Sequence, residues 1–82
     1  MIGMYYLYII RSTKEKRFYT GITDNIERRL KEHNSRKTKS TKAYVPWELI
    51  YSEQLKTRKE AREREKYWKS GTGRERIRIK HT

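Results

Sequence analysis

Short apolar runs alternate with polar stretches along this chain, and their spacing predicts two strands followed by helices. Residues 4–10 are all aromatic, branched or otherwise apolar, so an extended strand here carries apolar side chains on both faces. Because both faces are apolar, we expect a central strand that is covered on both sides. A polar stretch, residues 11–17, separates it from a second strand-like run at residues 18–23, and the two runs predict a β-hairpin.

Two later segments show helical periodicity. Asp24 lies three residues before an acid in a capping-box-like sequence, and a helix ending at Asn34 is predicted by the spacing of Ile26, Leu30 and His33. Thr57 opens a second capping box, and the residues after it predict another helix, which Gly71 and Gly73 end.

The remaining segments complete the order of elements. Residues 35–46 contain only basic charges, which predicts a solvated basic loop. In residues 47–52 large apolar side chains occupy alternate positions, which predicts a third strand. Residues 74–80 fit either a frayed helix or a short strand. The order β-β-α-β-α, with a final helix as an option, predicts an α/β fold of the α+β type: a small three-stranded sheet carrying helices, with residues 1–82 as a single domain.

The composition narrows the classes of function. Lys and Arg number 22 against 10 Asp and Glu, so the formal net charge is +12 on 82 residues, and a polyanion such as nucleic acid is the expected partner. The chain has no cysteine, which excludes a disulfide framework, a thiolate nucleophile and a cysteine-ligated zinc site. Its longest apolar stretch, residues 1–10, is too short to cross a bilayer, so we expect a soluble cytoplasmic protein with no membrane partner.

Two charged residues point toward the expected core when the helices are drawn at about 100° per residue. Arg29, rather than Arg28, borders the apolar stripe of the first helix, and Glu65 lies on the inner face of the second. Each has a simpler interpretation: the stem of Arg29 covers the core while its head reaches water, and Glu65 pairs with Lys69 one turn later. His33, at the edge of the first helix, is by itself most simply a packing residue.

The combination of these groups indicates a particular chemistry. Hydrolysis of a phosphodiester needs a divalent ion held by a carboxylate, a cation that faces the phosphate, and a group that takes a proton from water. An inner Glu, an inner Arg, a nearby His and the tyrosines of the strands supply these parts. Cleavage of nucleic acid is therefore the functional hypothesis that the residues themselves support.

Four segments occur in order along the chain: YLYI (residues 6–9), YTGIT (residues 19–23), NIERRLKEHN (residues 25–34) and EAREREKYWK (residues 60–69). In these segments the chain resembles a known family, the GIY-YIG nuclease domain, and the resemblance covers nearly the whole chain. The likeness is closest to small stand-alone bacterial GIY-YIG proteins. It implies a three-stranded antiparallel sheet flanked by helices. It also implies a metal-dependent endonuclease that hydrolyses DNA phosphodiester bonds with weak sequence specificity, with DNA repair or recombination as the process.

Residue by residue, the resemblance implies a site with one metal ion. Tyr8 and Tyr19 match the tyrosines of the two tripeptides of the family. Arg29 matches its catalytic arginine, and Glu65 matches the glutamate that binds one Mg²⁺ or Mn²⁺ ion. His33 matches a position that assists proton transfer or substrate binding. Either Tyr19 or His33 is then the general base, and the residues leave that choice open.

The chain departs from the family pattern in three places. Tyr6 replaces the glycine of the first tripeptide, Thr20 occupies the middle of the second, and no asparagine follows Glu65, where larger members have one. The missing asparagine favours an alternative: a catalytically inactive nucleic-acid-binding module, for DNA or structured RNA, on the same fold. A third alternative is an interaction protein whose basic surface binds acidic partners.

The expected partner is DNA, structured or branched DNA included, and RNA stays open as a second partner. The residues expected to contact its backbone are Arg17, Arg36, Lys37, Lys39, Lys42 and Arg58. Such contacts carry little base information, and affinity then falls with salt at a log–log slope of about −0.9 per phosphate neutralised. We expect the protein to act as a monomer or a weak dimer.

Overall fold

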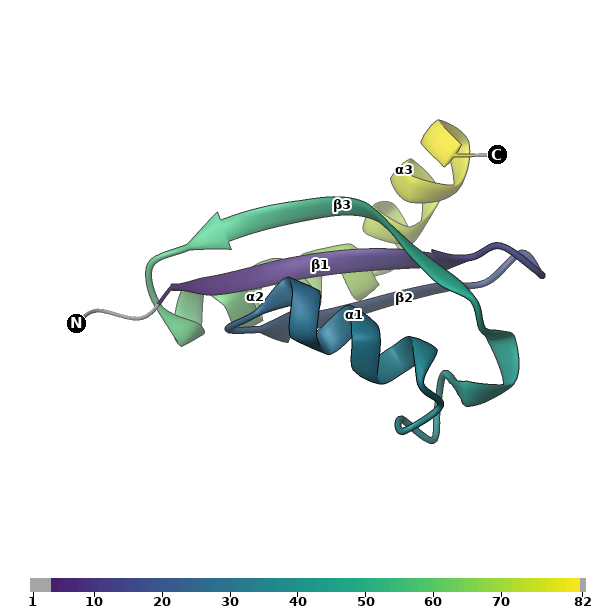
Figure 1. Cartoon of the computed structure of the whole chain (residues 1–82). Coiled ribbons are helices and arrows are strands. Elements are labelled where there is room, and N and C mark those ends of the chain that lie inside the picture. Colours follow the sequence, from purple (N-terminus) through teal and green to yellow (C-terminus); the bar gives the residue numbers. More distant parts are fainter. Residues whose placement is uncertain (1–3, 82) are drawn as a thin grey trace.

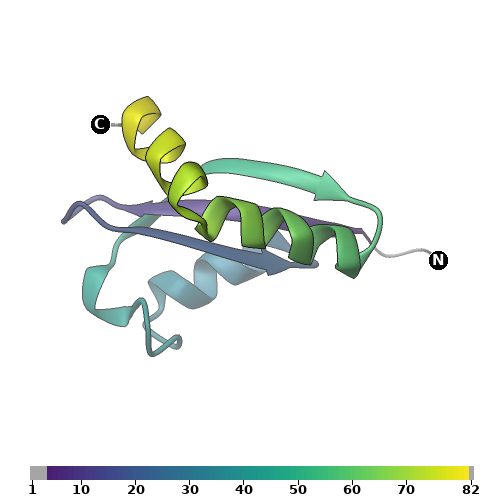
Figure 2. The same ribbon diagram turned by 180° about the vertical axis from the view of Figure 1, so that it is seen from behind.

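The computed structural model describes residues 4–81, which form one antiparallel sheet with helices on both faces (Figures 1 and 2). The first three residues of the apolar stretch at residues 1–10 lie outside the described part. The strands are β1 (Tyr5–Ser12), β2 (Phe18–Thr23) and β3 (Trp47–Leu55), in the order β2-β1-β3. The predicted three-stranded antiparallel sheet flanked by helices is confirmed. Among residues 4–81, no helix is both long and apolar enough to cross a membrane.

Strand β1 is central because both of its faces are apolar, as the sequence predicts. One face contributes to a core cluster of Leu7, Ile9, Trp68 and Ile77. The other face contributes to a second cluster of Tyr8, Ile10 and Trp47. The sheet thus separates two small cores, and each needs its own helical cover. A β-bulge in the pairing of β1 with β3 interrupts the alternation predicted for residues 47–52, and Leu49 is 40% exposed.

Helix α1 (Ile26–Asn34) covers the face of Tyr8, and its start corrects the capping residue predicted from the sequence. The N-cap is Asn25, whose side-chain oxygen accepts a hydrogen bond from the Arg28 amide at 2.9 Å. Asp24 lies outside the helix and pairs with the Arg28 guanidinium at 2.6 Å. Asn25 takes the cap because its extended backbone conformation brings its short side chain to the first turn.

Helix α2 (Arg58–Lys69) covers the opposite face of the sheet and begins at the predicted capping box. The Thr57 hydroxyl accepts a hydrogen bond from the Glu60 amide at 3.1 Å and lies 3.3 Å from the Glu60 carboxylate. The Thr57 hydroxyl thus caps the first turn, as the capping box predicts, and fixes the point where the chain leaves β3 and enters α2.

A carboxylate on β3 attaches this edge strand to α2. Glu53 accepts two hydrogen bonds from the Arg64 guanidinium, at 2.7 and 2.8 Å, and one from Trp68 Nε1 at 3.0 Å. The hydrogen bonds from Arg64 lower the pKa of Glu53 to about 2. Glu53 is therefore ionised at neutral pH, and this bidentate pair is the strong kind of ion pair.

The last segment is helix α3 (Gly71–His81) rather than a strand. Gly71 and Gly73 do not end α2 as left-handed caps, since no described glycine has a positive φ, and both lie in the first turn of α3. Ser70 separates the two helices and accepts a hydrogen bond from the Gly73 amide at 3.3 Å. At Gly73 an added Cβ would lie 2.6 Å from Trp68 Cα, so only glycine allows α3 to approach the end of α2.

Replacing Gly73 by alanine is expected to lower the free energy of unfolding by about 1–3 kcal/mol, because the added methyl group overpacks this helix–helix contact. Thermal unfolding followed by circular dichroism measures the effect, and about 1 kcal/mol corresponds to about 4–8 °C in a small domain. Gly71→Ala is the matched control: its added Cβ meets no atom within 4 Å, so its Tm should stay the same or rise. Equal Tm values for the two variants would contradict the close approach.

Candidate active site

The two tripeptides that resemble the family motif meet in the sheet. Tyr8 of β1 pairs with Gly21 of β2, and the Tyr8 ring lies over that glycine. A Cβ at position 21 would stand 2.7 Å from the Tyr8 hydroxyl oxygen. The absence of a side chain at Gly21 therefore leaves the space that the Tyr8 hydroxyl occupies.

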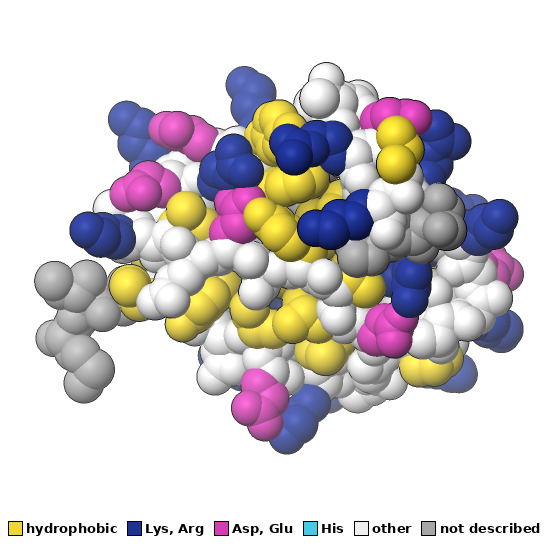
Figure 3. All heavy atoms as spheres, turned by 90° about the horizontal axis from the view of Figure 1, so that it is seen from above, with side chains coloured by type: hydrophobic (Ala, Val, Ile, Leu, Met, Phe, Trp, Pro, Cys, Tyr) yellow, Lys and Arg dark blue, Asp and Glu magenta, His cyan; other side chains and the backbone are white. Residues whose placement is uncertain are grey.

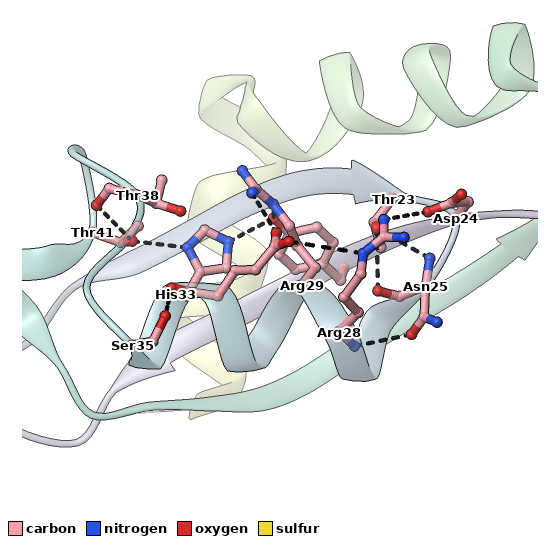
Figure 4. A network of polar contacts seen from close by, with 11 residues as sticks. Thr23, Asp24, Asn25, Arg28, Arg29, His33, Ser35, Thr38 and Thr41 are labelled. Atoms are coloured by element: carbon pink, nitrogen blue, oxygen red, sulfur yellow. Dashed lines mark hydrogen bonds and ion pairs between the residues drawn. The ribbon is translucent and has the colours of Figure 1, made fainter.

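The Tyr8 hydroxyl begins a buried chain of hydrogen bonds, and Figure 4 labels its later members His33, Thr41 and Thr38. It lies 2.8 Å from His33 Nε2, and His33 Nδ1 lies 2.8 Å from Thr41 Oγ1. The Thr41 hydroxyl donates to the Thr38 carbonyl at 3.4 Å, so it accepts from Nδ1–H. With the proton on Nδ1, Nε2 accepts the hydrogen of the Tyr8 hydroxyl. All three side chains are nearly inaccessible, with 2% exposure for Tyr8, 0% for His33 and 1% for Thr41.

Burial sets the protonation states of His33 and Tyr8 in this chain of hydrogen bonds. It lowers the pKa of His33 to about 4, with the Arg29 charge as a second cause. It also raises the pKa of Tyr8 to about 12, against the opposing effect of the hydrogen bond from Arg29. At neutral pH the imidazole is therefore neutral and the phenol keeps its proton.

Arg29 brings a positive charge to the Tyr8 end of this chain of hydrogen bonds. Its Nε donates to the Tyr8 hydroxyl oxygen at 3.4 Å, and its Nη1 donates to the Glu32 carboxylate at 2.9 Å (Figure 4). The hydrogen bond to Glu32 raises the pKa of Arg29 further above its ordinary value. The side chain is 31% exposed, so the guanidinium is oriented from two sides and still reaches the surface.

Tyr19 lies beside this chain on the edge strand β2. Its ring packs edge-on against the His33 ring, with centroids 4.9 Å apart, and its centroid is 6.2 Å from that of Tyr8. Tyr19 is only half-buried, and its hydroxyl is within electrostatic reach of the Arg29 charge. Of the two predicted candidates for the general base, Tyr19 is accessible from solvent and His33 is not.

Glu65 lies on α2, which covers the other face of the sheet (Figures 1 and 2). Its carboxylate pairs with Lys69 at 3.2 Å, the simpler of the two fates considered from the sequence, and its side chain is 17% exposed. The Glu65 charge nevertheless acts on the Tyr8 hydroxyl and contributes to its raised pKa. Arg29 and Glu65 make no direct contact among the interactions of the described residues, yet both act on Tyr8.

The donors around Glu65 decide how a metal ion could bind. Among residues 4–80, whose side chains the structure describes, there is no group of three or more His, Cys, Asp or Glu side chains arranged to hold a metal. Mg²⁺ is commonly held by one or two carboxylates together with water and phosphate oxygens. Glu65 fits that pattern as a single oxygen ligand, provided that the flexible Lys69 side chain, which is 49% exposed, releases it.

The residues predicted to contact a nucleic-acid backbone come from three parts of the fold. Four of them, Arg36, Lys37, Lys39 and Lys42, are exposed in the loop after α1, which contains a short 3₁₀ helix, η1 (Lys42–Tyr44). Arg17 lies beside this loop, with its guanidinium 4.7 Å from the centre of the Tyr44 ring. Arg58 begins α2 at the opposite end of the molecule (Figure 1).

Sequence reasoning missed the residues that orient the site. Thr41 is in a loop, where periodicity says nothing about which side chain turns inward. The ion pair of Glu32 with Arg29 could have been predicted, because Glu32 lies three residues after Arg29 on the same helix. Gly21 belongs to the motif YTGIT, but the sequence does not show why a glycine is required there. The reason is the Tyr8 hydroxyl that lies above it, and this contact follows from the pairing of β1 with β2.

This sheet, with its paired tripeptides and flanking helices, defines a GIY-YIG domain. The family model described as the GIY-YIG catalytic domain matches residues 4–78, and the chain belongs to this family. The GIY-YIG domain is that of a nuclease superfamily.

Small bacterial proteins of the UPF0213 group are among the relatives. The chain is 36% identical over 77 residues to the UPF0213 protein CPE1444 of Clostridium perfringens, covering 93% of this chain and 82% of that one. It is 42% identical over 66 residues to a UPF0213 protein of Bacillus licheniformis, covering 79% and 67%. The solution NMR structure of the UPF0213 protein BH0048 from Bacillus halodurans matches with a TM-score of 0.55 at 30% identity, covering 95% of this chain and 85% of that chain.

The buried state of His33 predicts a dependence of stability on pH. Because folding lowers the pKa of His33 from 6.5 to about 4, the unfolded chain binds a proton at pH values where the folded chain does not. The contribution of neutral His33 to the free energy of unfolding is complete above the pKa of the unfolded state. It is lost as the pH falls through the pKa of the folded state. Between about pH 7 and about pH 5 the wild type should lose about 2 kcal/mol of unfolding free energy from this residue.

Urea unfolding at the two pH values measures this loss, with His33→Gln as the comparison, because glutamine does not titrate. The variant is expected to be less stable at pH 7 but to lose less on acidification. A wild type and a variant that lose equal free energy would show that His33 is not held neutral.

Proposed function

We propose that the protein is a metal-dependent endonuclease that hydrolyses DNA phosphodiester bonds with weak sequence preference, in DNA repair or recombination. The observation that carries the proposal is the position of Arg29. Its guanidinium is held by Glu32 and Tyr8, reaches the surface, and shares the electrostatic environment of Tyr8 with the Glu65 carboxylate. Phosphodiester hydrolysis needs a cation that faces the phosphate and a carboxylate that holds a metal ion, and Arg29 and Glu65 supply these two kinds of group.

Arg29 would stabilise the phosphate as charge develops on it. The contacts among the described residues use Nε and Nη1, and Nη2 is then available to a non-bridging oxygen. Because Glu32 and Tyr8 already orient the guanidinium, little ordering remains to be done when the substrate binds. Such preorganised donors are the largest contribution in many enzymes.

Tyr19 would take the proton from the attacking water, directly or through another water. The burial of His33, and the use of both its ring nitrogens by Tyr8 and Thr41, argue against His33 as the direct base. Tyr19 is half-buried and lies within electrostatic reach of the Arg29 guanidinium, which would face the phosphate. His33 is better suited to hold the Tyr8 hydroxyl in the orientation that accepts from Arg29.

Glu65 would hold one Mg²⁺ or Mn²⁺ ion. Such an ion supplies charge neutralisation at the phosphate and makes a bound water more acidic. The rest of the coordination would come from water and phosphate oxygens, as is usual for Mg²⁺. The backbone on either side of the scissile bond would be held by Arg17, Arg58 and the basic loop at residues 35–46.

A second candidate function has its own support. The ion pair between Glu65 and Lys69, and the lack of an asparagine after Glu65, both favour a module that binds DNA or structured RNA without cleaving it. The two functions share the fold and the basic surface. They differ in the roles of Arg29 and Glu65: an endonuclease needs both residues for cleavage, whereas a binding module needs them at most for affinity.

Nicking of supercoiled plasmid and cutting of branched DNA, with Mg²⁺ or Mn²⁺, test the proposal on the wild type, Arg29→Ala and Glu65→Gln. Each variant is expected to lose about 10²–10³ in rate, because it lacks a charge that acts on the reacting phosphate. Matched controls are Arg28→Ala and Glu63→Gln, which remove the same charges from exposed positions on the same two helices. They should stay within about threefold of the wild type.

Binding of the same DNA in the presence of a chelator completes the test. If all five proteins bind alike and the wild type nicks no faster than Glu65→Gln, the enzyme is ruled out and the binding module is the function.

A further inference from the structure

A groove lies between the β1–β2 hairpin and the junction of α2 with α3. It has a volume of about 1160 Å³, which exceeds the range of about 300–1,000 Å³ typical of small-molecule sites. One wall is the hairpin turn, residues 13–17, and the other is formed by Lys69 and α3. We call it the hairpin groove.

The walls of the hairpin groove are strongly cationic. Among the residues that the structure describes, one acid, Glu15, lines it against seven lysine and arginine residues: Arg11, Lys14, Lys16, Arg17, Lys69, Arg74 and Arg78. Arg78 is paired with Glu75, whereas the side chains of Lys14, Lys16 and Arg74 take part in no ion pair among residues 4–81. Figure 3, which views the molecule from the side of β3 and α3, shows Lys and Arg side chains outnumbering the acids on that face.

The floor of the hairpin groove is apolar. It is built from core residues and their neighbours, Ile9, Phe18, Trp68 and Ile77. A sugar–phosphate backbone has the matching chemistry, because its sugars are weakly polar and its phosphates are anionic at regular intervals. Cations on two walls and an apolar floor therefore suit a backbone better than a single small anion.

Two residues connect the hairpin groove with the candidate active site. Lys69 lines the groove and also lines the hollow that contains Glu65. Tyr19 lines the groove and packs on the ring of His33. A strand that places a phosphate between Tyr19 and Glu65 would therefore continue into the groove.

We propose that the hairpin groove binds the sugar–phosphate backbone of one strand of DNA next to the scissile phosphate. This proposal rests on the proposed function in one respect, namely that the bound DNA is the substrate. The groove assigns a binding role to Lys14, Lys16 and Arg74, which the sequence did not single out, and it makes α3 one wall of the DNA site. The contact at Gly73 that sets α3 against α2 then also sets the width of the groove.

Fluorescence anisotropy with a labelled DNA duplex, in the presence of a chelator, tests the proposal on the combined variant Lys14→Ala, Lys16→Ala, Arg74→Ala. We expect binding to weaken about tenfold or more, and the log–log salt slope to become shallower by about 0.9 for each phosphate that the variant no longer neutralises. The control variant is Lys31→Ala, Lys56→Ala, Lys59→Ala, which removes three exposed charges outside the groove. It should bind within about threefold of the wild type, and circular dichroism checks that both variants fold.

A groove variant that binds as well as the control variant overturns the proposal. Competition separates DNA from an acidic protein as the occupant: unlabelled DNA should displace the probe, and polyglutamate at equal charge should not. Equal displacement by polyglutamate would also overturn it. This outcome is distinguishable from failure of the proposed nuclease function. If the wild type does not nick DNA but the groove variant binds DNA more weakly, the groove is a DNA-binding site and the protein is not an enzyme.

Discussion

The hydroxyl of Tyr8, buried over Gly21 and bonded to a neutral His33, is the constraint on which the rest of the site depends. Its position requires a strand partner without a side chain, a helix that brings an imidazole to the same core, and a loop that brings Thr41 to the far nitrogen. Each requirement comes from a different element. The chain of hydrogen bonds therefore joins β1, α1 and the loop after α1, and the glycine of β2 leaves room for it.

This buried chain also explains how a small and highly charged domain holds an arginine in place. A guanidinium at the surface of a single helix is usually free to move. Arg29 is instead bonded to Tyr8 on one side and to Glu32 on the other. Because β1 is covered on both faces, the charge of Glu65 on the opposite helix also reaches the Tyr8 hydroxyl. The central strand is therefore the element through which the charges of both helices act on Tyr8.

The elements could be read from the sequence because their signals are local. Apolar residues on both faces of residues 4–10 predicted a central strand, and the capping box at Thr57 predicted the start of α2. The inward direction of Arg29 and Glu65 followed from helical geometry alone. The signals for residues 74–80 were ambiguous. The two glycines before this segment suggest the end of a helix, but Gly73 serves a close contact between helices that only the fold reveals.

Features that depend on several elements at once could not be predicted. Thr41 and the Glu53 pair are tertiary contacts, and no spacing in the chain encodes them. The hairpin groove is formed by residues about sixty positions apart in the sequence, so their charges look scattered until α3 lies beside the hairpin. Net charge predicted a polyanionic partner, but it pointed to the acid-free loop, where the charges are adjacent in sequence.

Line broadening by Mn²⁺ in NMR spectra of the Arg29→Ala variant bound to DNA tests most directly whether one site includes both helices. The substitution is expected to slow cleavage, and it leaves Glu65 unchanged. The account predicts that broadening is centred on Glu65 and extends across the sheet edge to Tyr19 and Tyr8. Broadening centred on other acids, such as Glu15 or Glu75, with Glu65 unaffected, would contradict it.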